Sequence, residues 1–175
     1  MRSFRTSTLT AAMALAVMAA PASAADKLTD AQIAHIAYTA GHLDVEAAEQ
    51  ALKLSKTATV RAFADDMVRD HKAVNDKALA LVKKLGVTPE DNATSKALAK
   101  QADAKRAELA KLSGAAFDKA YVDNEVAFHK TVDDALAKTL IPGASNGELK
   151  SLLETGLKIF KGHEQHAEHL AAKLH

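Results

Sequence analysis

The chain has 175 residues, with 23 Lys and Arg against 22 Asp and Glu, eight His and no Cys. Because the formal charge is close to neutral and only 4% of the residues are aromatic, the composition indicates neither a basic nor a stacking surface for nucleic acid. The absence of cysteine excludes disulfides, catalytic thiolates and thiolate metal ligands, so the fold must be stable through packing alone.

Residues 1–24 have the three parts of a secretory signal peptide. Two arginines precede an apolar run from Leu9 to Ala20, and Ala22-Ser23-Ala24 supplies a small-residue cleavage site. No later run approaches the roughly 18 consecutive apolar residues of a membrane span. We therefore expect a single soluble domain, residues 25–175, that is exported, most simply to a bacterial periplasm, and has no transmembrane segment.

After the expected cleavage site, Ala, Leu, Lys and acidic residues dominate, and no alternating strand pattern is present. Glycine and proline concentrate in LGVTPEDN and IPGASNG, which are typical of connections between helices. The predicted helices, in chain order, are Thr29–Leu54, Thr59–Leu85, Thr94–Leu112, Ala115–Leu140 and Asn146–Leu174. We treat the third and fourth as one segment that is kinked or divided near Gly114. Four long segments with short connections predict an all-α, up-down-up-down four-helix bundle.

The final thirteen residues contain half of the histidines of the chain, three in the last predicted helix and His175 directly after it. A zinc-protease motif, H-E-x-x-H, is excluded because Ala167 stands where the second histidine would be needed. At about 100° per residue, His163 lies in the apolar stripe of this helix and His166 lies on its flank. His169 and His175 are turned toward solvent, so the four histidines do not form one site.

The same projection places ionisable residues on the inward side of every long segment. His35 and His42 fall on the opposite face of the first helix and are expected at the surface. Glu125 and His129 are one turn apart and can share a ligand. The inward or flanking set is Asp44, Asp70, His71, Glu125, His129, His163 and His166. Burying such groups is costly unless they pair, reach water or bind a cation.

Two interpretations of this set remain open. In the first, His71, His129 and His163 bind one zinc or copper ion, with Asp44, Asp70 and Glu125 as further ligands or partners, for storage, buffering or stress protection. Such binding should weaken as the pH falls through about 6.5, because imidazole must be neutral to coordinate. In the second, the polar residues pair with one another, and the chain is a metal-free envelope stress or interaction protein. No catalytic triad, phosphate loop or nucleotide motif is present, which disfavours an enzyme.

Two stretches carry a resemblance to a known family: VRAFADDMVRDHKAVNDKALALVKKLG and LSGAAFDKAYVDNEVAFHK. With the histidine-bearing last helix, they resemble the family called domain of unknown function 4142. The resemblance implies an exported bacterial protein with a ferritin-like helical bundle, and it implies no established activity. Asp44 stands where Glu is commoner in the family.

A ferritin-like fold raises the question of a di-iron site, which requires Glu-x-x-His on two helices. The nearest match here, Glu125 and His129, has a different spacing. A histidine-rich set with few carboxylates favours one zinc or copper ion over two irons.

Overall fold

The computed structural model describes residues 27–174, and all regular secondary structure in this range is helical, with no strand. The expected signal peptide lies outside the described residues. The elements are α1 (Asp30–Leu54), α2 (Ala58–Leu85), α3 (Ala93–Leu109), α4 (Gly114–Ala135), the π-helical turn η1 (Leu136–Leu140), α5 (Ile141–Gly143) and α6 (Gly147–Leu174). The prediction of an all-helical chain is confirmed.

Local sequence signals explain where the helices begin and end. Thr29 caps α1: its side chain accepts a hydrogen bond from the Gln32 N–H, and the Gln32 side chain accepts one from the Thr29 N–H. Gly86 ends α2 in the left-handed conformation, with φ 63°, which disfavours any residue with a Cβ. Ser113 occupies the N-cap position of α4, but its side chain makes no capping hydrogen bond.

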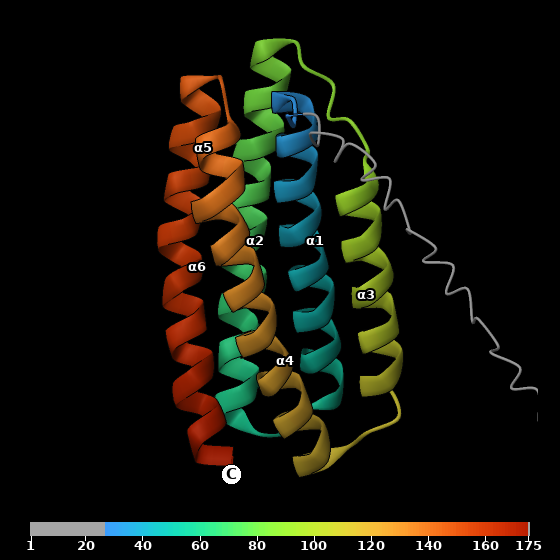
Figure 1. Cartoon of the computed structure of the whole chain (residues 1–175). Coiled ribbons are helices and arrows are strands. Elements are labelled where there is room, and N and C mark those ends of the chain that lie inside the picture. Colours follow the sequence, from blue (N-terminus) through green and yellow to red (C-terminus); the bar gives the residue numbers. More distant parts are fainter. Residues whose placement is uncertain (1–26, 175) are drawn as a thin grey trace, which may run out of the picture.

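The segment predicted to be kinked or divided near Gly114 is divided there into two helices, which run in opposite directions. Figure 1 shows each long helix reversing the direction of the one before it, and α3 runs alongside α1. Because α3 carries the chain back along the bundle, α2 and α4 run in the same direction. The described chain therefore has five long helices where four segments were predicted, and the division near Gly114 is a full reversal of the chain between α3 and α4. Gly114, with φ 55°, lies where α4 begins after this reversal.

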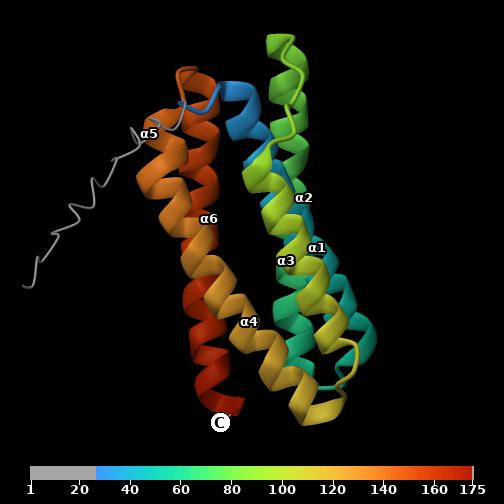
Figure 2. The ribbon, with the colours of Figure 1, turned by 45° about the vertical axis from the view of Figure 1, so that its right-hand side comes forward.

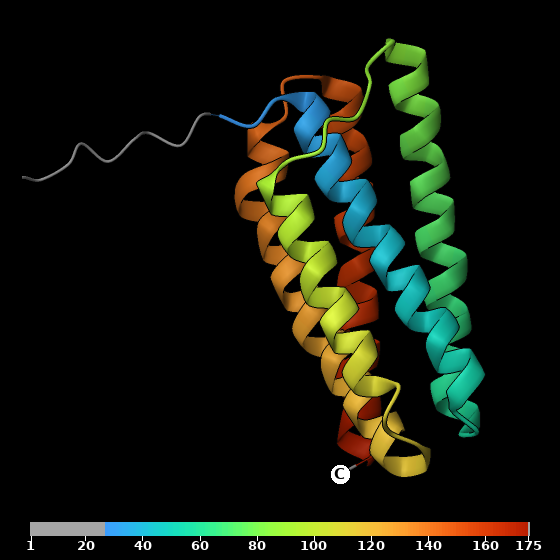
Figure 3. The same ribbon diagram turned by 90° about the vertical axis from the view of Figure 1, so that its right-hand side faces the viewer.

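The helices pack pairwise, α1 on α2 and α4 on α6, and α2 also packs on α6. Figure 2 shows α4 and α6 on one side and α1, α2 and α3 on the other. In Figure 3 the end of α2 projects beyond the start of α1, and the connection to α3 runs back from it. The Asp30 carboxylate joins the two sides, because it accepts hydrogen bonds from the backbone N–H groups of Ser145, at 2.7 Å, and Asn146, at 2.9 Å.

The core consists of two apolar clusters with a polar layer between them. The cluster nearer the α1–α2 connection includes Ala48, Phe63, Met67, Phe117, Tyr121 and Leu170. The other, nearer the start of α1, includes Ile33, Ile36, Leu136, Leu140, Leu153 and Phe160. Between these clusters α1, α2, α4 and α6 each bury at least one ionisable side chain, and this polar layer includes Asp44, His71, Glu125, His129 and His163. None of the helices in residues 27–174 is long and apolar enough to cross a membrane.

Candidate metal centre

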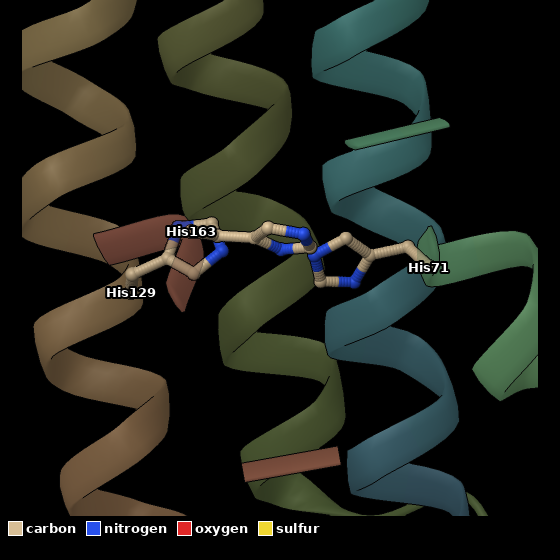
Figure 4. A group of neighbouring side chains, drawn as sticks. All are labelled: His71, His129 and His163. Carbon is tan, nitrogen blue, oxygen red and sulfur yellow. The ribbon is translucent and has the colours of Figure 1, made fainter. Parts of the chain in front are cut away.

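Three helices each place one histidine in the polar layer. His71 comes from α2, His129 from α4 and His163 from α6, and their exposed fractions are 1%, 1% and 7%. One ring nitrogen from each lies within 4.8 Å of the others. Figure 4 shows the three rings turned toward one another. Ligand nitrogens around a tetrahedral ion lie roughly 3.4 Å apart, as bond lengths near 2.0–2.1 Å require, so small side-chain adjustments would bring these three into range.

A second group of ligand atoms adjoins the first. Asp44 on α1 and Glu125 on α4 also lie within 4.8 Å of a His129 nitrogen and of each other. Asp44 Oδ2 is 3.4 Å from His71 Nε2 and 3.8 Å from His129 Nε2. Glu125 Oε2 is 3.7 Å from His129 Nδ1. Because His129 belongs to both groups, α1, α2, α4 and α6 contribute to one continuous layer.

Backbone hydrogen bonding determines which nitrogen of His129 is free. His129 Nδ1 lies 2.9 Å from the Glu125 carbonyl oxygen, one turn earlier on α4. A carbonyl oxygen only accepts, so Nδ1 carries the proton and donates it. His129 Nε2 is buried and has no hydrogen-bond partner. Its lone pair is therefore available to a cation.

A carboxylate orients His163 in a similar way. Asp70 Oδ2 lies 3.1 Å from His163 Nε2, and Arg69 donates to both oxygens of Asp70, at 2.8 and 3.0 Å. The hydrogen bond from Arg69 lowers the pKa of Asp70, so this group is a carboxylate and His163 Nε2 donates to it. His163 Nδ1 is left buried without a partner. A carboxylate that holds the far nitrogen of a histidine is the usual arrangement behind metal-bound histidines.

The three histidines are held in the neutral, metal-binding form. Burial lowers the pKa of His129 to about 4 and, with the neighbouring histidines, lowers the pKa of His71 well below its usual value. Burial also lowers the pKa of His163. Both nitrogens of His71 lack a hydrogen bond, and its ring stacks on Phe160 at 4.4 Å with an interplanar angle of 5°.

The carboxyl groups of the layer lack a cationic partner. Burial raises the pKa of Glu125 to about 7, and burial, followed by the nearby charge of Glu125, raises the pKa of Asp44 well above its usual range. Burial and these two carboxyls also raise the pKa of the Tyr121 hydroxyl, which has no hydrogen-bond partner. No Lys or Arg is among the buried residues of the described chain. A bound cation would thus supply a charge that the surrounding protein does not provide.

Two of the sequence-predicted site residues lie outside this layer. His166 is exposed, its ring meets Phe63 edge-on at 5.1 Å, and it belongs to neither group of converging ligand atoms. The reason is rotational, because three residues further along a helix the side chain is turned about 60° away from His163. Asp70 is partly buried and contacts the layer only through His163.

The surface histidines agree with the projection except in one case. His42 and His169 are exposed as predicted, and His175 lies outside the described residues. His35 was predicted to be exposed but is half-buried, with a buried Nδ1. The helix projection assumes one buried face, and α3 covers a second side of α1.

Asp133 is a buried carboxyl that the sequence analysis did not identify. It lies one turn beyond His129 and is 4% exposed, with both carboxyl oxygens unpartnered. Burial, followed by the charge of Glu164, raises the pKa of Asp133 to about 7. The spacing Glu125, His129, Asp133, four residues at each step, could have indicated that it shares the inward face.

Comparison with known proteins identifies the family. The pattern that defines the family described as Domain of unknown function (DUF4142) matches residues 14–170. The chain belongs to the DUF4142 family. The DUF4142 chain is also similar to a solved structure, the crystal structure of a DUF305 fragment from Deinococcus radiodurans, with a TM-score of 0.72 and 15% sequence identity. The alignment covers 82% of this chain and 95% of that chain, and at this identity it shows the fold alone. No curated protein matches the DUF4142 chain.

Proposed function

We propose that this DUF4142 protein binds one transition-metal ion, zinc or copper, in the polar layer of its core. The observation that carries the proposal is the convergence of His71, His129 and His163 from three helices, each buried, neutral and with a lone pair free of hydrogen bonds. The role that follows is storage, buffering or protection against metal stress. With the signal peptide expected at residues 1–24, this role belongs in the periplasm.

The proposed ligands are the three histidines, with Asp44 as the fourth. Asp44 Oδ2 is within 4 Å of nitrogens of both His71 and His129, and no other carboxylate oxygen approaches two of the three histidines in the described residues. Three imidazoles and one carboxylate suit zinc or copper, whereas a di-iron site requires more carboxylates. Asp70 would orient His163 without contacting the ion.

The proposal extends to the fold. We treat α1, α2, α4 and α6 as a ferritin-like four-helix core and α3 as the one long crossover connection that such bundles contain between their second and third helices. The parallel direction of α2 and α4 supports this interpretation.

Two contacts favour the metal-free alternative. The Asp70–His163 hydrogen bond, at 3.1 Å, and the approach of Asp44 to His71, at 3.4 Å, allow Asp and His side chains to satisfy each other without an ion. In that case the layer fixes the register of the helices, and the chain acts in the envelope through an exposed surface.

Elemental analysis of untagged protein, expressed as the full chain and recovered from the periplasmic fraction, separates the two functions. We expect one zinc or copper ion per chain, and recovery in that fraction also tests export. Substitution His71→Ala should abolish stoichiometric binding, measured by titration against a competing chelator. Substitution His169→Ala, an exposed histidine of α6, should leave binding unchanged. Protein recovered without zinc or copper would support the metal-free alternative. Equal binding by both variants, each shown to be helical by circular dichroism, would show that the ion binds outside this layer.

A further inference from the structure

A cavity of about 300 Å³ lies beside the polar layer, in the half of the bundle nearer the start of α1. Its walls come from α1, α2, α3, α4, η1 and α6. Phe160 is one of these walls, and the same ring stacks on His71. The cavity therefore begins one aromatic ring away from the candidate metal centre without sharing a ligand with it.

Small side chains create this space. Five alanines line it, at inward positions where a closely packed bundle would place larger residues: Ala34, Ala37, Ala40, Ala78 and Ala135. The π-helical turn η1 adds to the opening, because Leu136, Thr139 and Leu140 of this turn also line it. Such turns are rare and occur frequently at functional sites.

The lining is uncharged. No Asp, Glu, Lys, Arg or His is among the described residues that line the cavity. Its polar groups are the amide of Asn75 and the hydroxyls of Tyr38, Thr94, Thr131 and Thr139, and the three threonines are exposed, so they lie at the rim. An apolar interior with a few uncharged polar groups is typical of small-molecule sites.

We propose that this cavity binds a neutral, largely apolar small molecule with an uncharged polar end, such as a hydroxyl, placed near the threonines. An apolar cavity of about 150 Å³ stays dry and binds benzene, so a cavity of twice that volume accommodates roughly ten to twelve carbon atoms. A charged headgroup is excluded from the interior, because no counter-charge or network of hydrogen bonds would replace its water.

The test is displacement of the fluorescent probe N-phenyl-1-naphthylamine by straight-chain 1-alkanols from hexanol to dodecanol, with chelator-treated protein. Affinity should rise about fourfold for each added methylene, the ratio expected for burying one CH₂, and stop rising at roughly ten to twelve carbons. Decanoate and decylammonium at neutral pH should displace the probe at least tenfold more weakly than decanol. The absence of metal makes the result independent of the proposed metal site.

A pair of variants on α2 links the effect to the cavity. Substitution Ala78→Leu fills part of the cavity, so the increase of affinity with alkanol length should stop about three carbons earlier than in wild type. Hexanol should still bind, which an unfolded variant could not show. Ala80 is exposed on the same helix and does not line the cavity. Substitution Ala80→Leu should therefore leave the affinities for all the alkanols unchanged. Decanoate binding as tightly as decanol, or the same length limit in wild type and Ala78→Leu, would overturn the proposal.

Discussion

His129 is the residue shared by both groups of ligand atoms in the polar layer. Its Nδ1 is held by the Glu125 carbonyl, so its Nε2 faces the other ligands with a free lone pair. The pKa of His129, lowered to about 4 by burial, keeps this lone pair available well into the acidic range. The pH dependence expected from a free imidazole, near 6.5, therefore does not apply to this layer.

The pH dependence of zinc binding should distinguish the histidines from the carboxyls. Because the pKa of Glu125 is raised to about 7, this carboxyl is protonated below that pH. A zinc ion that needs the carboxylate nearby must then displace the proton, so the affinity for zinc should fall as the pH drops from 7 to 5. In Glu125→Gln the fall in affinity should be smaller, because the pKa values of the histidines are lowered and only Asp44, whose pKa is still raised by burial, would have to release a proton. Chelator competition at several pH values measures both profiles. Parallel profiles would show that Glu125 takes no part in binding.

The same carboxyl should make stability depend on pH. The pKa of Glu125 is about 7 in the folded state, against the ordinary value of 4.5 in the unfolded chain, so between these pH values the folded state holds more protons than the unfolded state. The protonated carboxyl therefore contributes to the free energy of unfolding. This contribution is fully present below about pH 4.5 and is lost as the pH rises through 7. Metal-free Glu125→Gln should avoid this loss. Between pH 4.5 and pH 8 its free energy of unfolding should therefore rise, relative to that of wild type, by on the order of 3 kcal/mol.

Urea unfolding at several pH values measures this gain. Glu154→Gln, at an exposed position of α6, is the matched control and should follow the wild-type profile. If the difference between Glu125→Gln and wild type did not change with pH, Glu125 would not retain its proton in the fold.

At the scale of the element, we expect substitution of glycine by alanine to have opposite effects on stability at Gly86 and Gly162. Gly86 ends α2 with φ 63°, so Gly86→Ala should cost about 1 kcal/mol even though nothing lies within 4 Å of the added Cβ. Gly162 is exposed within α6 and also has open space around a Cβ, so Gly162→Ala should stabilise by about 1 kcal/mol through helix propensity. Thermal unfolding of the two variants beside wild type tests the contrast. A shift of the same sign in both would contradict the left-handed conformation at Gly86.

At the scale of the whole molecule, a metal bound between helices should stabilise the fold. His71, His129 and His163 come from three helices that separate on unfolding, so the ion binds the folded state preferentially. Zinc at about 100 times its Kd should add about 2.7 kcal/mol to the free energy of unfolding, and a chelator should remove this gain. Calorimetry of wild type and His71→Ala measures it. A zinc-dependent rise in Tm of equal size in both would indicate binding elsewhere.

The amino-acid sequence by itself determined the helices and the direction in which most side chains face. The capping residues at Thr29, the glycine at Gly86 and the apolar stripes act within a few residues of one another, so their effects can be predicted without the fold. The inward positions of Asp44, His71, Glu125, His129 and His163 follow from the same short-range periodicity.

Only the tertiary structure decided which of these residues meet. The reversal between α3 and α4 and a kink at Gly114 satisfy the same local rules, and α3 reverses because it packs along α1. The convergence of His71, His129 and His163 depends on the rotation and axial position of three separate helices. His163 and His166 differ by three residues, yet one reaches the layer and the other faces solvent. Such contacts are set by the packing of side chains from distant segments, which short-range periodicity does not encode.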